Sequence, residues 1–265
     1  MKNFLQDIIA LKRKEVEALK SKRPITEFVD SKRLLRGIRP FKEAISGGDG
    51  LNLIAEIKKK SPSFGRNFFR KLDIAGIANI YKKEGAKAMS VLTDKKFFSG
   101  SILHMNEVKR AIDLPVLRKD FIIDEYQVYE SRYFGADAIL LIARVLSADE
   151  IKSFMHLAKR INMDVIVEIH DENDLEKALL SNPDIIGVNN RDLDTLEVSI
   201  ENGLKLIPKI PEEIIKVSES GISSNEDIEK IKKAGINAVL IGGAFLESGD
   251  IAARVREVMG NEGKG

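Results

Sequence analysis

Short apolar runs rich in Ile, Val and Leu alternate with longer segments of helical periodicity from residue 51 onward. Within the runs consecutive positions are apolar, rather than every second one, which is typical of parallel strands buried on both faces. The pattern predicts eight strands, at residues 53–57, 88–92, 115–117, 136–142, 164–167, 185–188, 215–217 and 238–241. Ile54 and Val239 are 185 residues apart, so the seven steps between strands average about 26 residues, the length of one compact βα unit.

The segments between the predicted strands carry helix signals at both ends. Helices at 74–83, 125–133, 148–160 and 225–234 each follow a side chain that can cap the first turn: Asp73, Asp124, Ser147 and Ser224. Three segments end at a glycine, which is typical of left-handed helix stops: Gly85, Gly135 and Gly235. An open doubly wound sheet would show the same alternation. The count of eight, and the lack of a Gly-x-Gly-x-x-Gly turn after the first strand, favour an α/β protein of the (β/α)8 TIM-barrel class.

A helical extension precedes the predicted barrel. Residues 3–21 carry apolar side chains at helical spacing among Lys and Glu, which predicts an amphipathic helix packed on the main body: Leu5, Ile8, Ile9, Val16 and Leu19. We expect shorter helical pieces at 31–36 and 40–46, and the glycine-rich segment 47–50 marks a boundary. The chain is therefore expected to be one domain over 1–265, with a helical extension at 1–47 and the barrel at 51–260.

Composition narrows the range of functions. The 265 residues are 43% hydrophobic and include no cysteine, which excludes a disulfide framework, a cysteine-ligated metal and a thiolate nucleophile. The three histidines, His104, His156 and His170, show no metal-ligand spacing, so we expect no metal. No apolar run approaches the roughly 18 residues of a membrane span, and the first residues lack the layout of a signal peptide. We therefore expect no membrane association and a cytoplasmic location.

The net charge of +2 is unevenly distributed, because residues 1–47 hold 12 Lys or Arg and 6 Asp or Glu, giving +6 there and −4 over the rest. A basic segment that binds nucleic acid usually interleaves aromatic residues, but here only Phe4 and Phe28 precede Phe41. We interpret the charges as solvated helix faces that help to attract an anionic substrate, and we expect no nucleic-acid partner.

Reactive side chains follow the predicted strands at the end where a parallel barrel builds its active site. They lie in the segments 56–63, 118–121, 168–170, 189–192, 218–221 and 242–244. Since alternate side chains of a strand share a face, we expect Glu56 and Lys58 to point into the barrel with Ile54 and to form an ion pair. Each charge alone is consistent with a structural ion pair at the rim. Glu56, Lys58, Lys119 and Glu168 together would shift one another's pKa values, as acid and base catalysis near neutral pH requires.

Glycines follow the seventh and eighth predicted strands, at Gly221 and at Gly242 and Gly243. Their backbone amides, with a short helix over 244–247, predict a phosphate cradle, although the glycines could also serve only as turn formers. Arg191 and Lys59 would add positive charge for a phosphate or a carboxylate. A lysine at this end of the barrel could instead form a Schiff base with a carbonyl substrate, as in barrel aldolases, and the residues alone leave that possibility open.

Seven ordered segments carry a resemblance to a known family: 54–63 (IAEIKKKSPS), 90–94 (SVLTD) with 98–101 (FSGS), 117–121 (LRKDF), 167–170 (VEIH), 186–193 (IGVNNRDL), 218–222 (SESGI) and 240–242 (LIG). In these motifs the chain resembles the indole-3-glycerol-phosphate synthase family over essentially its whole length. The resemblance implies closure of 1-(2-carboxyphenylamino)-1-deoxyribulose 5-phosphate to indole-3-glycerol phosphate, with loss of carbon dioxide and water, in tryptophan biosynthesis. It implies a small phosphorylated substrate and no cofactor.

The resemblance also implies roles for individual residues. Lys119 would be the general acid that protonates or polarises the ketone while the aromatic carbon attacks it. Glu168 would assist the dehydration together with the pair of Glu56 and Lys58. Which of Lys58 and Lys119 delivers the proton at each step stays open, because coupled groups share their titration.

Further residues would bind the substrate. Asn189 would orient its hydroxyls, Ser61 and Arg191 would bind its carboxylate, and Phe98 and Phe121 would sandwich its aromatic ring, with core packing as the alternative for the two phenylalanines. Ser220 and Glu219 would support the mouth around Lys58. Phosphate would be bound by four residues: Lys59, Gly221, Gly242 and Gly243.

One segment departs from the family. Where the family commonly has a small residue or lysine followed by an acidic stretch, residues 64–71 read FGRNFFRK, which predicts a lid of altered mobility. Two alternatives to the family assignment are another phosphate-binding barrel, such as a phosphosugar isomerase or Schiff-base aldolase, and a barrel that binds a metabolite without turnover. We expect a monomer or weak homodimer.

Overall fold

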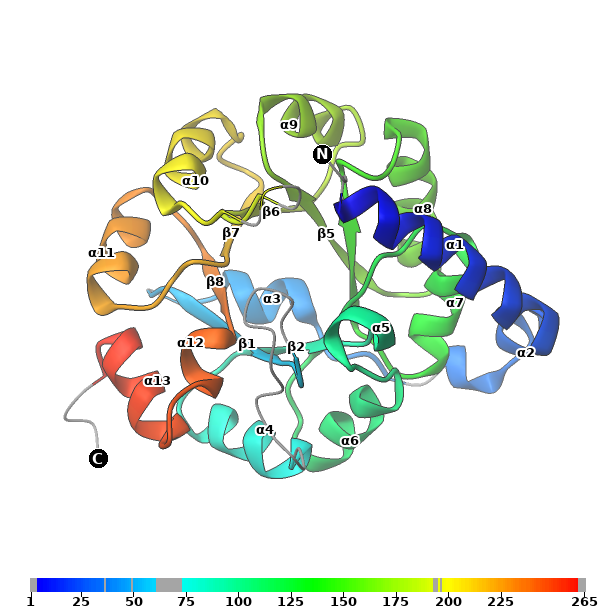
Figure 1. Cartoon of the computed structure of the whole chain (residues 1–265), viewed down its shortest axis with the longest axis horizontal. Coiled ribbons are helices and arrows are strands. Elements are labelled where there is room, and N and C mark those ends of the chain that lie inside the picture. Colours follow the sequence, from blue (N-terminus) through cyan, green and yellow to red (C-terminus); the bar gives the residue numbers. More distant parts are fainter. Residues whose placement is uncertain are drawn as a thin grey trace.

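The computed structural model describes residues 4–35, 37–48, 50–60, 73–192, 195 and 197–261. Eight parallel strands form a closed barrel in sequence order, with β1 paired to both β2 and β8 (Figure 1). The strands are β1 Asn52–Ile57, β2 Ala88–Leu92, β3 Val116–Lys119, β4 Ala138–Ile142, β5 Asp164–Ile169, β6 Ile185–Asn189, β7 Ile215–Glu219 and β8 Ala238–Ile241. The predicted closed (β/α)8 barrel is confirmed.

Helices surround the strands and alternate with them along the chain (Figure 1). They are α4 Ile74–Lys83, α5 Lys95–Phe98, α6 Leu103–Ala111, α7 Glu125–Tyr133, α8 Ala148–Arg160, α9 Glu172–Leu179, α10 Ile200–Leu206, η3 Ile207–Lys209, α11 Asn225–Lys233, α12 Gly243–Leu246 and α13 Ile251–Met259. The four predicted caps accept a hydrogen bond from the first turn of α4, α7, α8 and α11. The three predicted glycine stops have φ angles of 92°, 92° and 79°, a left-handed conformation that favours glycine.

Strand residues are buried on both faces, which explains their continuous apolar runs. Leu53, Ala55 and Ile57 of β1 pack outward in the layer between strands and helices. Ile54 belongs to a separate cluster inside the barrel, together with inward residues of the other strands such as Leu140 of β4. This alternation sends the side chain of Glu56 inward, as predicted.

The helical extension comprises α1 Phe4–Lys22, α2 Thr26–Val29, the 3-10 helix η1 Lys32–Leu35 and α3 Phe41–Ser46. The four-residue α2 was not predicted, since a single turn has too few positions to show a period. Phe41 and Ile45 of α3 are fully buried in the interior cluster and close the amino-terminal end of the barrel, where the Asn52 amide donates to the carbonyl of Ile45. At the opposite end Leu5 and Ile8 of α1 join the same interior cluster.

Two expectations about α1 were wrong. Leu19 is 40% exposed rather than packed on the barrel. Val16, the other apolar residue of the second half of α1 in the predicted stripe, is buried against Phe28 and Tyr126. Lys12, expected on a solvated face, is only 6% exposed, because it contacts carboxylates far along the chain. None of the described helices is both long enough and apolar enough to cross a membrane.

Candidate active site

A cavity of about 360 Å³ opens at the carboxyl ends of the strands. Every strand except β2 and β4 contributes a polar or charged side chain, or a glycine turn, to its wall, and α1 contributes two apolar residues. Its polar and charged lining is Glu56, Lys58, Lys119, Asp120, Glu168, Asn189, Arg191, Ser220, Ser223 and Glu247. The structure therefore brings together the four groups whose convergence the sequence predicted, Glu56, Lys58, Lys119 and Glu168.

Glu56 and Lys58 form the predicted ion pair, with Lys58 Nζ 2.8 Å from Glu56 Oε1. Glu56 points inward from β1, and Lys58 follows one residue after the end of that strand. Burial would raise the pKa of Glu56, but the charges of Lys58 and Lys119 outweigh it and hold that pKa below its usual value. Glu56 is therefore ionised at neutral pH and bridges the two lysines.

Lys119 ends β3 and lies between two carboxylates. Its Nζ is 2.6 Å from Glu219 Oε2 and 3.6 Å from Glu56 Oε2. Burial would lower the pKa of Lys119, but the charges of Glu219, Glu56 and Glu168 raise it above its usual value. Lys119 is thus held as an ammonium group in contact with the cavity.

Glu219 is fully buried beneath Lys119 and does not line the cavity. The sequence predicted that it supports the mouth around Lys58, whereas its ion pair is with Lys119. Burial, reinforced by the charges of Glu168 and Glu56, raises the pKa of Glu219 to about 7 despite the attraction of Lys119. Space for this carboxylate depends on Gly187, where a Cβ atom would lie 2.4 Å from Glu219 Oε1.

Asn189, Asn190 and Arg191 form the wall after β6. Asn189 lines the cavity, and its Oδ1 accepts a hydrogen bond from the backbone amide of Arg191 at 3.0 Å. Asn190 points the other way, and its Nδ2 donates to Ser218 Oγ and to the carbonyl of Ser220. Alternation along the chain thus directs Asn189 to the cavity and uses Asn190 to hold β6 against the end of β7.

The glycines predicted to form a phosphate cradle lie in the turns after β7 and β8. Ser220 and Gly221 have φ angles of 66° and 75°, and Gly242 and Gly243 begin α12. A Cβ atom at Gly242 would lie 2.7 Å from Glu56, so only glycine fits there. A Cβ at Gly243 would be 3.6 Å from Lys58 Nζ, which places the Lys58 charge beside this turn.

The opposite wall is apolar. The rings of Phe98 and Phe121 both line the cavity, with centroids 6.5 Å apart and planes inclined by 33°. Leu5 and Ile8 of α1 complete this side. The sequence indicated that Leu5 and Ile8 are buried, but no local pattern identifies the part of the molecule that they contact.

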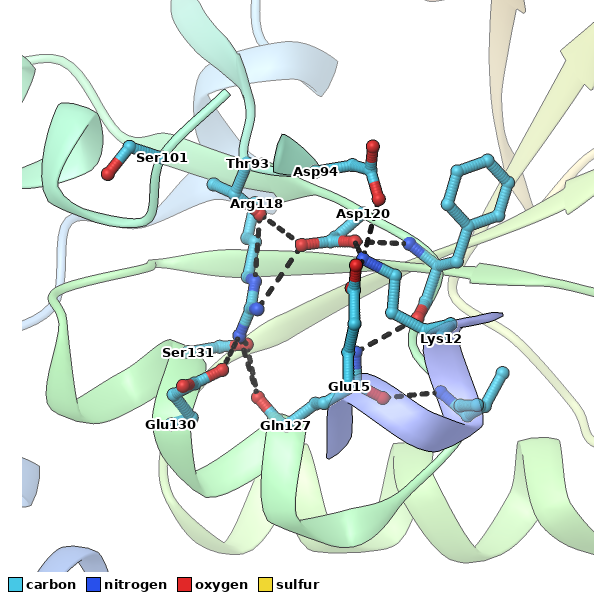
Figure 2. Close-up of polar contacts among 12 residues, drawn as sticks. Lys12, Glu15, Thr93, Asp94, Ser101, Arg118, Asp120, Gln127, Glu130 and Ser131 are labelled. Atoms are coloured by element: carbon cyan, nitrogen blue, oxygen red, sulfur yellow. Dashed lines mark hydrogen bonds and ion pairs between the residues drawn. The ribbon is translucent and has the colours of Figure 1, made fainter. Parts of the chain in front are cut away.

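A second buried network ties α1 to this wall (Figure 2). Lys12 Nζ lies 2.6 Å from Asp94 and 3.0 Å from Asp120. Asp94 caps α5, which carries Phe98, while Asp120 directly follows Lys119 and accepts a hydrogen bond from the Phe121 amide at 2.8 Å. Lys12 therefore links the helix that covers the mouth to both segments that carry the aromatic wall.

Other charges complete the network. Arg118 lies 3.3 Å from Asp120 and 2.9 Å from Glu130, and the hydroxyl of Thr93 donates to Asp120. Burial would raise the pKa of Asp120, but Arg118 and Lys12 hold it at about 2. Sequence reasoning missed this network because Lys12 has the same local pattern as the exposed lysines of α1.

The remaining predicted site residues are placed as follows. Ser61 and the predicted lid at 64–71 lie outside the described residues. Lys59 does not line the cavity among the described residues, and its charge helps to lower the pKa of His104, after burial. Glu247, which was not predicted, lines the cavity from the end of α12, where its position after a four-residue helix gives no sequence signal.

The fold and site define a (β/α)8-barrel enzyme whose acid and base groups meet at the carboxyl ends of the strands. The chain belongs to the indole-3-glycerol phosphate synthase family, whose model matches residues 5–258. The indole-3-glycerol phosphate synthase of Caldanaerobacter subterraneus subsp. tengcongensis is 44% identical over 259 residues, covering 97% of this chain and 99% of the relative. That of Endomicrobium trichonymphae is 49% identical over 218 residues, covering 82% and 84%.

Solved structures support the fold alone. The 3-hexulose-6-phosphate synthase from Salmonella typhimurium superposes with a TM-score of 0.63 at 14% sequence identity, covering 78% of this chain and 96% of that one.

Proposed function

We propose that this protein catalyses the closure of 1-(2-carboxyphenylamino)-1-deoxyribulose 5-phosphate to indole-3-glycerol phosphate, a decarboxylating ring closure of tryptophan biosynthesis. The family membership supports the reaction. The observation that carries the proposal is that Glu56, Lys58, Lys119 and Glu168 line one cavity, beside the glycine turns after β7 and β8.

Lys119 acts as the general acid. Its raised pKa keeps it in the ammonium form, which is the form that polarises the ketone oxygen as the aromatic carbon attacks. The alkoxide that develops there is a stronger base than an amine, so it takes the proton from Lys119. Glu219, 2.6 Å from Lys119, holds the amine in place during the transfer.

Loss of carbon dioxide from the ring carbon then restores the aromatic ring. Glu168 takes a proton from the substrate carbon next to the nitrogen, and the hydroxyl leaves as water with a proton from one of the acid groups of the site. The pair of Glu56 and Lys58 assists, and either Lys58 or Lys119 serves as the proton donor of this step. Asn189 orients the substrate hydroxyls.

Binding is divided between the two walls. The phosphate binds to the backbone amides of Gly221, Gly242 and Gly243 with Lys58 nearby, and Lys59 adds positive charge. Ser220 supports this turn. Arg191 and Ser61 bind the substrate carboxylate.

The aromatic ring of the substrate binds at Phe98 and Phe121. Their centroid distance of 6.5 Å is close to the roughly 7 Å that a third ring stacked between them requires.

The direct test is to mix the purified protein with the anthranilate-derived deoxyribulose phosphate and to follow indole fluorescence. The chain has no tryptophan, so the product signal rises from a low background. Substrate that is bound but not consumed would instead indicate a binding protein. Borohydride trapping of a lysine with a keto phosphate would indicate an aldolase.

We also propose that the protein works in the cytoplasm as a monomer or weak homodimer. The four groups that carry the proposed chemistry all come from a single chain, so the proposed reaction needs no side chain of a second subunit. Light scattering across a range of protein concentrations tests this, and a stable tetramer would contradict it.

A further inference from the structure

His170 follows β5 directly and lies two residues after Glu168, on the same side of the chain. Its side chain is 2% exposed and its ring is held between two carboxylates: Nε2 is 3.4 Å from Glu168 Oε1, and Nδ1 is 3.4 Å from Asp174 Oδ2. Among the described residues neither ring nitrogen makes a hydrogen bond of good geometry. Glu168 lines the cavity and His170 does not, so the imidazole contacts the carboxylate from behind.

The arrangement selects one protonation state of the ring. A neutral imidazole has one N–H donor and one lone pair, so between two carboxylates its lone pair would face a negative charge. Only the imidazolium presents a donor to both. Burial would lower the pKa of His170, but Asp174 and the charge of Glu168 raise it above its usual value.

The surrounding charges are consistent with a cation at this point. Besides Glu168 on β5, the charged groups that act on His170 are Asp174 of α9 and Arg144 after β4. Arg144 lies 2.6 Å from Asp171 and 3.4 Å from Asp174, and it opposes the charge of His170. The backbone amide of His170 donates to Asp174 at 3.1 Å, which fixes the segment that carries the ring.

Glu168 requires a cationic partner because the two lysines of the site form their ion pairs with other carboxylates. Lys58 pairs with Glu56, and Lys119 pairs with Glu219 and Glu56. The ion pair that the described part of the chain provides for Glu168 is with His170. A carboxylate that is 2% exposed without a counterion would carry a large desolvation cost.

We propose that His170 is a positioning residue, a buried imidazolium that serves as the counterion of Glu168 and aims its carboxylate into the cavity. The proposal rests on the proposed function, in which Glu168 carries a proton from the substrate. While Glu168 holds that proton, the imidazolium loses its counterion, which favours release of the proton and return of Glu168 to its anionic form. His170 keeps its own proton throughout, so no bond to it is made or broken.

The charge of the ring is measured without any turnover. The chain has three histidines, so nitrogen-15 labelling of histidine gives few signals, assigned with His104→Gln and His156→Gln. We expect both nitrogens of His170 to be protonated at neutral pH, and Glu168→Gln to lower the pH at which the ring loses its proton. A neutral single tautomer of His170 at neutral pH in the wild-type protein overturns the proposal and leaves the proposed function untouched.

Kinetics of three variants separate charge from hydrogen bonding. His170→Leu removes both and is expected to lower kcat by about 10- to 100-fold with little change in KM, because Glu168 is misplaced rather than lost. His170→Gln restores an amide donor near the position of Nε2 and is expected to recover much of that loss. His170→Asn reaches only toward Asp174 and is expected to recover less. Exposed His156→Gln is the matched control.

The pH dependence gives a readout that a purely structural role would not change. The cation exists below the pKa of His170, so the ratio of wild-type kcat to that of His170→Gln should fall toward one as pH rises through that pKa. Taking the ratio cancels the titration of Glu219, which both proteins share. A ratio that is independent of pH, or a His170→Leu variant with wild-type kcat, contradicts the proposal.

Discussion

Two buried charge networks lie side by side in this barrel, and each contains at least three carboxylates and two cations. The mouth contains Glu56, Glu168 and Glu219 with Lys58 and Lys119, and the anchor of α1 contains Asp94, Asp120 and Glu130 with Lys12 and Arg118. One carboxylate of each network nevertheless shows an opposite pKa shift, Asp120 in the anchor and Glu219 in the mouth. The pKa of Asp120 is lowered to about 2, whereas that of Glu219 is raised to about 7.

The difference lies first in the neighbouring charges, because Asp120 has two cations beside it whereas Glu219 has one cation and two further carboxylates. Hydrogen-bond donors add to it. Asp120 accepts hydrogen bonds from Thr93 and from a backbone amide, and Asp94 accepts one from the Phe97 amide at 2.7 Å. In the mouth, Glu219 Oε1 is buried without a hydrogen-bond partner among the described residues. The anchor is therefore internally satisfied and stabilises the fold, while the mouth keeps acid and base groups available for a substrate.

The largest effect is expected from the mouth. Lys119→Met should abolish ring closure, by on the order of 10³-fold or more, because it removes both the proton donor and the charge that polarises the ketone. The fold should stay intact, since Lys119 lies at a strand end and Glu219 can take up a proton when its partner is lost. Product fluorescence and circular dichroism test the two parts. Wild-type turnover in this variant would remove Lys119 from the mechanism.

A substitution in the anchor is expected to lower the free energy of unfolding rather than the activity. Lys12→Met leaves Asp94 and Asp120 buried with less compensation and is expected to cost about 3 kcal/mol in the free energy of unfolding. Lys20→Met is the matched control, since Lys20 also ties α1 to the barrel, through Asp124 at 2.7 Å, but is 37% exposed. It should cost less than about 1 kcal/mol. Equal losses in denaturant unfolding of the two variants would show that the anchor is no different from a surface ion pair.

The raised pKa of Glu219 has a consequence for stability against pH. Between its ordinary value of 4.5 and about 7, the folded protein binds a proton that the unfolded chain has released. This stabilisation is complete below the lower value and is lost as pH rises through the upper one. Relative to Glu219→Gln, the wild-type protein should therefore lose on the order of 2 kcal/mol between about pH 5 and about pH 8. A constant difference between the two unfolding curves would place the titration elsewhere.

The smallest effect is expected in the proposed phosphate cradle. Gly243→Ala introduces a methyl group at ordinary contact distance from Lys58 and Glu247, so the fold should tolerate it. The methyl occupies the space beside the turn, and KM should rise by about 10-fold with little change in kcat. At Gly249 a Cβ meets nothing within 4 Å, so Gly249→Ala serves as the control. Equal KM values for the two variants would argue against phosphate binding at this turn.

The sequence predicted the order and number of the strands because burial on both faces leaves a clear apolar signal. The limits of β2 and β8 were predicted without error, but β3, β5 and β7 continue two residues beyond their predicted ends, to Lys119, Ile169 and Glu219. In the sequence an apolar run ends at its first charge, whereas in the structure inward charges at a strand end are stabilised by one another. Two of these extended strands end at charged residues of the candidate site, Lys119 and Glu219.

The mouth could be predicted because parallel strands bring their carboxyl ends to one edge. The anchor could not, because Lys12 has the same local pattern as the exposed lysines of α1, and its partners Asp94 and Asp120 lie in distant segments. For the same reason the sequence showed that Leu5 and Ile8 are buried without showing that they line the cavity. Burial is a local signal, whereas the identity of the contact is a tertiary property.

The position of α1 has a practical consequence for redesign. Leu5 and Ile8 shape the cavity from a helix that contributes no strand to the barrel. Trimming either side chain should therefore widen the range of accepted ring substituents without disturbing the pairing of the strands. The shape of the cavity and the pairing of the strands are thus determined by separate stretches of the chain.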